Sequence, residues 1–164
     1  KVNAMMYRQN SQARSDCDTD RIEEIEMNLA TEEQLEQFVE FASSAIGAPK
    51  EWLTGYYGNL IARQELWGYW ESDDILATGE CRKFDEHQTQ FADLGMIVAQ
   101  EERGKGLATR VVHFLKQHAN SQGLEAMCST ESSNIGAQKA ITRAGLSSKH
   151  RILQFDFSEL KEAD

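Results

Sequence analysis

Hydrophobic residues along the chain recur at every second position in some segments and at every third or fourth position in others, with polar turns between them. The first spacing is typical of half-buried strands, and the second is typical of helices packed on one face. The pattern predicts strands over 25–29, 66–70, 75–84, 91–99, 126–130 and 152–157, and helices from Thr31 to Gly47, from Pro49 through Leu60, from Ala108 to Gly123 and from Asn134 to Ala144. Hairpins mixed with crossovers predict an α/β sandwich around a mixed, largely antiparallel central sheet, with helices on both faces.

The first 21 residues are polar and show almost no hydrophobic periodicity. We interpret residues 1–21 as a flexible N-terminal arm or an expression-vector remnant, and residues 22–164 as a single domain around one core. No apolar run approaches the roughly 20 residues that a membrane-spanning helix needs. Because the start also lacks the layout of a secretion signal, we expect a cytoplasmic protein that does not enter a membrane.

Charge is distributed unevenly along the chain. There are 17 Lys and Arg against 27 Asp and Glu, a net charge of −10, which argues against a nucleic-acid-binding protein. Residues 103–151 nevertheless carry a local charge of +6. This segregation predicts a site for a small polyanion in that segment and an acidic remainder that attracts cationic substrates. The plainer alternative is solubility charge distributed by chance.

Cysteine and histidine positions show no pattern that indicates a cross-link or a metal. Cys17, Cys81 and Cys128 are odd in number and far apart, so we expect reduced, unpaired thiols. The histidines share no metal-ligand spacing, and the sequence therefore predicts no metal site.

The most informative segment is the glycine-containing turn between the fourth predicted strand and the third predicted helix. Gly104 and Gly106 allow positive φ and close backbone approach, and the unpaired N–H groups of the first helical turn attract an anion. Arg103, Lys105 and Arg110 add full charges. The turn therefore predicts a phosphate-binding site, with a simple strand-to-helix connection as the alternative.

Two common nucleotide-binding motifs fit this turn poorly. A P-loop is excluded because the GxxxxGK[ST] spacing occurs nowhere in the chain. A dinucleotide fingerprint lacks its third glycine, since Thr109 stands there, and the preceding sheet reads as antiparallel. A dinucleotide-dependent oxidoreductase is therefore kept only as a control hypothesis.

The spacing of Arg103, Gly106 and Ala108 resembles motif A of the GNAT superfamily of acyl-CoA N-acyltransferases, which is Gln or Arg, two residues, Gly, one residue, then Gly or Ala. Asn134 and the helix after it resemble the second cofactor-contacting segment of that family, although Leu146 replaces the usual Phe after Gly. The resemblance covers approximately residues 25–157 and is strongest over 94–146.

The resemblance implies that acetyl-CoA binds along the fourth predicted strand and across the glycine turn. The residues that it assigns to coenzyme A are Met96, Ile97, Val98, Arg103, Gly104, Lys105, Gly106, Leu107, Ala108, Thr109, Asn134, Ala137, Lys139 and Arg143.

The resemblance also implies that an amine attacks the thioester directly in a ternary complex, which requires a base in the central cleft. We take Asp93 as the first candidate base and Glu80 as the second, against the alternative that both are solvent-facing strand carboxylates. The tyrosine that many members use as an acid is Ile141 here. Cys128 is a candidate donor in its place, or simply a small buried residue.

The sequence is thus interpreted as an N-acetyltransferase for an unidentified, cationic small-molecule or peptide amine. The alternative is a CoA-binding regulatory or interaction module without turnover, which Ile141 favours. Aromatic residues in or just after the second predicted helix, Trp52 and Tyr56 among them, suit an acceptor-side wall or a core equally well. Because only one strand is predicted after the last helix, we hypothesise that a partner subunit in a homodimer completes the sheet or the cleft.

Overall fold

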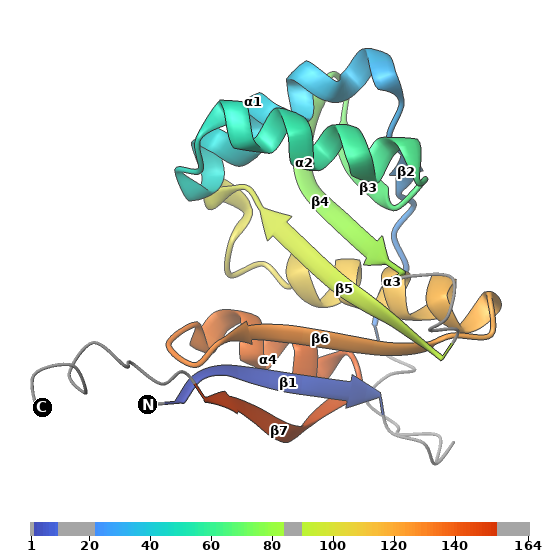
Figure 1. The fold of residues 1–164 in the computed structure, drawn as a ribbon, viewed down its shortest axis with the longest axis vertical. Helices are drawn as coiled ribbons and strands as arrows, with labels where there is room; N and C mark the ends of the chain where they lie inside the picture. The colour runs from blue at the N-terminus through green and yellow to red at the C-terminus, as the bar shows by residue number, and fades with distance from the viewer. Residues whose placement is uncertain (1, 10–21, 84–89, 154–164) are drawn as a thin grey trace, which may run out of the picture.

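The computed structural model describes residues 2–9, 22–83 and 90–153 (Figure 1). From β2 onward, the elements follow the predicted order of strands and helices. They are β1 (Val2–Gln9), β2 (Asn28–Leu29), η2 (Glu32–Gln34), α1 (Leu35–Ile46), α2 (Lys50–Ala62), β3 (Leu66–Glu71), β4 (Asp74–Arg82), β5 (Phe91–Val98), η3 (Gln100–Glu102), α3 (Leu107–Ser121), β6 (Glu125–Glu131), α4 (Ile135–Arg143) and β7 (Leu146–Leu153).

The strands form one seven-stranded sheet in the order β2-β3-β4-β5-β6-β1-β7. Among the described strands, only β5 and β6 run parallel, and every other neighbouring pair is antiparallel. The helices α1 and α2 pack on the β3–β5 part of one face, whereas α3 and α4 cover the other face (Figure 1). This arrangement confirms the predicted α/β sandwich around a mixed, largely antiparallel sheet.

Strand β1 contradicts the prediction that residues 1–21 form an arm. It lies between β6 and β7 and pairs antiparallel with both, so that Met5 faces Thr130 on one side and Arg151 on the other. Tyr7 is 4% exposed and belongs to the hydrophobic core. The alternating Met5 and Tyr7 are the signal that was missed. Residues 10–21, with Cys17, lie outside the described residues.

The C-terminal part of the sheet also differs from the prediction. β7 begins directly after Gly145, not at Ile152, and residues beyond Leu153 lie outside the described part of the chain. The place beside β6 is occupied by β1 of the same chain. β1 thus supplies a strand of this part of the sheet, and completion of the sheet or the cleft by a partner subunit in a homodimer stays a prediction.

Two hydrophobic clusters hold the layers together. One joins the sheet to α3 and α4, with Leu94, Val111 and Leu115 at its centre. The other packs α1 and α2 against the opposite face around Phe38 and Tyr57. Each cluster lies behind one side of β5, and the position of β5 is therefore fixed from both faces.

We expect Tyr7→Ala to lower the free energy of unfolding by about 3 kcal/mol, because it removes a fully packed aromatic ring and leaves a cavity. Urea unfolding of both proteins would measure the change. Trp52→Ala is the matched control, since Trp52 is 59% exposed, and its loss should be about 1 kcal/mol or less. Equal stability of Tyr7→Ala and the wild type would contradict a central role for β1.

Candidate active site

The site begins where the two parallel strands separate. β5 and β6 pair only from Phe91–Glu125 to Leu94–Cys128, although β5 continues to Val98 and stays paired with β4 over that length. The two strands diverge beyond Leu94 (Figure 1). The second half of β5 therefore has a free edge on the β6 side.

Backbone groups of β5 point into this opening. The N–H of Ala99 donates to Leu76 O on the β4 side, and backbone direction alternates along a strand. The polar groups of Met96 and Val98 consequently face the β6 side. The carbonyl of Val98 accepts a hydrogen bond from Arg103 Nε at 3.3 Å. The main-chain groups of Met96 are positioned to bind an extended ligand.

A cavity of about 430 Å³ occupies the opening and extends over the first turns of α3 and α4. It is lined by all the residues predicted to bind coenzyme A except Lys105. Glu102, Gly136 and Ala140 also line it and lie within the two segments, 96–109 and 134–143, that the resemblance assigns to the coenzyme. Ile46, at the end of α1, lines it too and was not predicted.

The glycine turn has the conformation that the sequence predicted. Gly104 and Gly106 have φ of +81° and +80°, and a Cβ on either would meet nothing within 4 Å. Gly106 is the N-cap of α3, and no side chain caps the helix. The N–H groups of Leu107, Ala108 and Thr109 are thus left for a ligand or water, at the positive end of the helix dipole.

The charged side chains near this turn do not all serve the cavity. Arg103 donates to the main-chain oxygens of Val98 and Ala45 and so ties the end of β5 to α1. Lys105 pairs with Glu102 at 3.4 Å, and Arg110 pairs with Glu23 at 3.6 Å. Each of the three cations thus has a partner within the chain, and a role for them at an anion stays a prediction.

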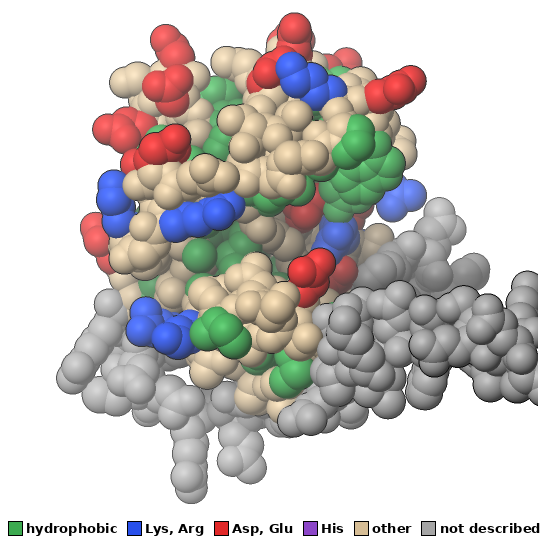
Figure 2. Space-filling model, turned by 90° about the vertical axis from the view of Figure 1, so that its left-hand side faces the viewer, with side chains coloured by type: hydrophobic (Ala, Val, Ile, Leu, Met, Phe, Trp, Pro, Cys, Tyr) green, Lys and Arg blue, Asp and Glu red, His purple; other side chains and the backbone are tan. Residues whose placement is uncertain are grey.

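Two cations of α4 are better placed to meet an anion. Lys139 and Arg143 line the cavity and form no ion pair with another described residue. Asn134 lines it too, and its Oδ1 accepts the N–H of Ala137 at 3.1 Å as the N-cap of α4. Figure 2 shows a hollow with Lys and Arg side chains along its rim and Asp and Glu side chains gathered above it.

The two predicted base candidates lie together on the α1–α2 face of the sheet. Glu80 of β4 is opposite Gly95 of β5, and Arg82 is opposite Asp93. Arg82 Nη2 is 2.7 Å from Asp93 Oδ2, and Arg82 Nη1 donates to the hydroxyl of Tyr56 at 2.8 Å. Neither carboxylate faces solvent, since Glu80 is 8% exposed and the side chain of Asp93 is 14% exposed. Sequence reasoning missed Arg82 and the role of Tyr56.

Burial alters the proton affinity of both carboxyl groups. It raises the pKa of Glu80 above its ordinary value, while Arg82 and a hydrogen bond from Tyr56 partly oppose the shift. Burial likewise raises the pKa of Asp93, against the influence of Arg82. The cluster can therefore accept a proton more readily than exposed carboxylates do.

Cys128, the predicted proton donor, lies elsewhere. It is 3% exposed and belongs to the core on the α3–α4 face, with Ile141, away from the face that carries Glu80 and Asp93. Burial raises the pKa of its thiol to about 12. A thiolate nucleophile at neutral pH is therefore disfavoured.

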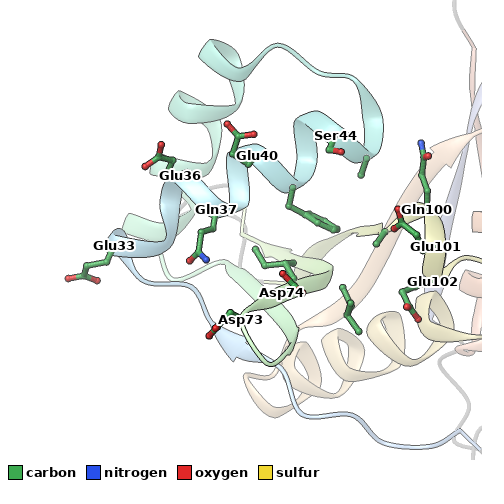
Figure 3. A pocket seen from close by; sticks show the side chains of 15 residues that line it. Glu33, Glu36, Gln37, Glu40, Ser44, Asp73, Asp74, Gln100, Glu101 and Glu102 are labelled. Atoms are coloured by element: carbon green, nitrogen blue, oxygen red, sulfur yellow. The ribbon is translucent and has the colours of Figure 1, made fainter.

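A second cavity of about 910 Å³ lies between α1, the β3–β4 turn and η3. Its walls are strongly acidic: the labelled carboxylates come from η2, α1, the β3–β4 turn with the first residue of β4, and η3 (Figure 3). They are Glu33, Glu36, Glu40, Asp73, Asp74, Glu101 and Glu102. Because Glu102 lines both cavities, a basic and an acidic region adjoin each other on this side of the molecule.

Within the described residues, no three His, Cys, Asp or Glu side chains are grouped so that they could hold a metal ion. The same part of the chain contains no helix that is both long and apolar enough to cross a membrane. Cys81 and Cys128 are free and buried.

The family model of the GNAT acetyltransferases matches residues 27–146. A GNAT-family acetyltransferase structure from Colwellia psychrerythraea is 55% identical, with a TM-score of 0.85, and the match covers 92% of this chain and 54% of that one. The present chain thus spans about half the length of that relative. A search of curated proteins gave no match.

More distant structures share the fold. One is a GNAT-family protein from Novosphingobium aromaticivorans, with 15% identity, a TM-score of 0.69 and coverage of 92% of this chain and 61% of that one. Another is an aminoglycoside N-acetyltransferase in complex with CoA, with 10% identity, a TM-score of 0.65 and coverage of 80% and 93%. With the family match over most of the sheet and the whole glycine turn, these findings establish that the chain belongs to the GNAT family of acetyltransferases.

Proposed function

We propose that this chain binds acetyl-CoA in the cavity between β5, α3 and α4 and transfers the acetyl group directly to an amine. The proposal rests on one observation: two sets of unpaired backbone groups open into the same cavity. The free edge of β5 at Met96 and the uncapped N-terminus of α3 both open into it. Such a pair of features suits a ligand with an extended amide-containing arm and a pyrophosphate, and the family uses acetyl-CoA.

The residues present fit the parts of this substrate. The N–H groups of Leu107, Ala108 and Thr109, together with Lys139 and Arg143, would hold the phosphates. The backbone of Met96 would bind the arm, as a strand pairs with an added strand, and the same N–H is available to a developing oxyanion. The match with the family's coenzyme segments supports this placement.

The transfer needs positioning and removal of one proton. The amine nitrogen bonds to the acetyl carbonyl carbon, the carbon–sulfur bond breaks, and the amine proton moves to a carboxylate. Asp93 and Glu80 are the proposed acceptors of that proton. Cys128 is a weak donor for the departing thiolate, because a thiol with a pKa of about 12 binds its proton more tightly than an ordinary thiol does. Water is the better source.

The acceptor is proposed to be a cationic amine of a small molecule or a peptide. The net charge of −10 and the acidic cavity beside η3 support this class, because they create a negative potential around the site. The shared fold with an aminoglycoside N-acetyltransferase makes aminoglycosides one class to test, beside polyamines, amino acids and peptide N-termini.

One observation favours a second function. Ile141, 1% exposed, stands where many family members carry the acidic tyrosine. A CoA-binding regulatory module without turnover would not require that hydroxyl. The two functions predict the same coenzyme binding and differ only in turnover.

Acetyl-CoA and CoA should both raise the melting temperature. At about 100 times its dissociation constant, a ligand adds roughly 2.7 kcal/mol to the free energy of unfolding. NADH and ATP, measured side by side by thermal denaturation, should add much less. A shift with NADH alone would overturn the coenzyme assignment.

With acetyl-CoA and a panel of the four amine classes, we expect release of free CoA thiol that depends on the amine. A thiol-reactive dye would measure the rate, and mass spectrometry would show the gain of one acetyl group on the amine. Tight coenzyme binding with no release for any amine would favour the regulatory module.

Gly106→Leu should abolish the stabilisation by acetyl-CoA, because a side chain at this position enters the open space in front of α3. The matched control is Gly123→Leu. Gly123 also has a positive φ of +76° and empty space around it, but does not line the cavity. Both variants should lose about 1–2 kcal/mol of stability through backbone strain. Equal acetyl-CoA affinity in both would disprove the anion site.

A further inference from the structure

The carboxylate cluster beneath α2 is adjacent to the start of the β5–β6 opening. Leu94 is the last residue of β5 that pairs with β6, and Gly95 is the next residue. Glu80 lies directly opposite Gly95 on β4. The cluster is therefore one residue away from Met96, which lines the coenzyme cavity.

The absence of a side chain at Gly95 makes room for Glu80. A Cβ built on Gly95 would lie 2.5 Å from Glu80 Oε2 and 3.5 Å from Arg82 Nη2. No residue other than glycine fits without displacing this carboxylate. The position of Glu80 thus depends on the backbone of the strand that borders the cavity.

The two carboxylates of the cluster have different partners. Asp93 forms a short ion pair with Arg82, with 2.7 Å between Oδ2 and Nη2. Glu80 has no ion pair with another described residue, and Tyr56 lies close enough to it to lower its pKa. Tyr56 in turn accepts a hydrogen bond from Arg82. The four side chains form one chain of contacts with Glu80 at its end.

One oxygen of Glu80 has no hydrogen-bond partner within the described residues. This oxygen, Oε1, is buried, as is the whole residue, which is 8% exposed. A buried, unsatisfied carboxylate oxygen is unfavourable unless a ligand supplies a donor. Asp93 Oδ1 is also unsatisfied, but Asp93 forms an ion pair with Arg82. Glu80 is therefore the carboxylate that combines an unsatisfied oxygen with the lack of an ion pair to another described residue.

We propose that Glu80 is the group that takes the proton from the acceptor amine, that Asp93 serves as the counter-ion of Arg82, and that Tyr56 and Gly95 are positioning residues for the Glu80 carboxylate. This inference rests on the proposed acetyl transfer and assigns separate roles to the two carboxylates. In the step, an N–H bond of the amine breaks, its electron pair stays on nitrogen for attack, and the proton bonds to Glu80 Oε1. Glu80 later returns the proton to water.

Several titratable groups lie near Glu80, and four of them shift its pKa. They come from α2, from the residue before β3, from β4, from β5 and, across the sheet, from β6: Tyr56, Tyr57, Glu65, Arg82, Asp93 and Cys128. Tyr56 and Arg82 lower the pKa of Glu80, whereas Asp93 and Glu65 raise it. Variants of Tyr56 and Asp93 should therefore move this pKa in opposite directions.

The first experiment compares two carboxylate variants with the wild type, using the amine that gives turnover. Glu80→Gln should lower kcat by at least about 100-fold, the usual contribution of a positioned base, with the KM for acetyl-CoA changed by no more than about twofold. Asp93→Asn, which can still hydrogen-bond to Arg82, should lower kcat by less than about tenfold. The reverse ranking would overturn the proposal.

The pH dependence of kcat/KM tests whether Tyr56 acts on the Glu80 carboxylate or only contributes to stability. The rate should fall on the acidic side as Glu80 becomes protonated. Tyr56→Phe removes a bond that favours the ionised form and should move this fall to higher pH, whereas Asp93→Asn should move it to lower pH. Tyr57→Phe is the matched control, because Tyr57 is not among the groups that shift the pKa of Glu80, and it should leave the profile in place. An unmoved profile in Tyr56→Phe would contradict the proposal.

Gly95→Ala tests the same point without altering a titratable group. It should lower kcat by at least about tenfold, because its Cβ displaces the Glu80 carboxylate. Gly68→Ala is equally crowded, 2.7 Å from Trp70 Nε1, but touches no carboxylate. It should lose stability and keep its kcat. Equal kcat in the two variants would overturn the role of Gly95.

A second readout does not depend on turnover. Carbon-13 NMR of labelled carboxyl groups follows the titration of Glu80, which is assigned by its absence in Glu80→Gln. If acetyl-CoA binds and no amine is acetylated, the proposed transfer fails. The titration then still tests whether Tyr56 and Asp93 act on Glu80. The Glu80 pKa must rise in Tyr56→Phe and fall in Asp93→Asn, and any other result overturns the roles assigned to these residues.

Discussion

The rest of the structure depends on one interruption of hydrogen bonding, the end of the β5–β6 pairing at Leu94. An unpaired strand edge inside a protein is unfavourable, because backbone polar groups need partners. Here the edge is maintained because β4 pairs with β5 from Asp93 to Val98 and α3 packs behind both strands. Arg103 fixes the far end of the strand through hydrogen bonds to Val98 and Ala45. The opening is therefore built into the folded chain.

Strand β5 presents side chains of the carboxylate cluster on one face of the sheet and free backbone groups along its edge. Asp93 and Gly95 face the α1–α2 layer, where β4 contributes Glu80 and Arg82. The backbone of Met96 faces the opening that leads to the N-terminus of α3. Along this strand, the backbone that borders the cavity and the carboxylate cluster are thus about one residue apart. Placing both on a strand held from two faces limits the movement of the groups relative to each other.

The parts of this arrangement that depend on local sequence could be predicted from it. A glycine turn between a strand and a helix determines its own conformation, so Gly104, Gly106 and nearly all of the cavity lining followed from spacing and resemblance. β1 did not, because a strand between β6 and β7 is specified by partners more than a hundred residues away in sequence. The pairing of Arg82 with Asp93 and Tyr56 likewise requires the β4–β5 register and the packing of α2.

The number of charged residues in a segment does not show which of them are free to bind a ligand. The surplus of cations after residue 103 predicted an anion site, yet Arg103, Lys105 and Arg110 are all engaged with partners of this chain. The groups that remain for the proposed anion are chiefly the first-turn N–H groups of α3, with Lys139 and Arg143 at the margin. Backbone dipoles fixed in a helix need no rearrangement when a ligand arrives, whereas long side chains lose rotamer freedom. The spacing of two glycines consequently matters more for this site than the number of positive charges around it.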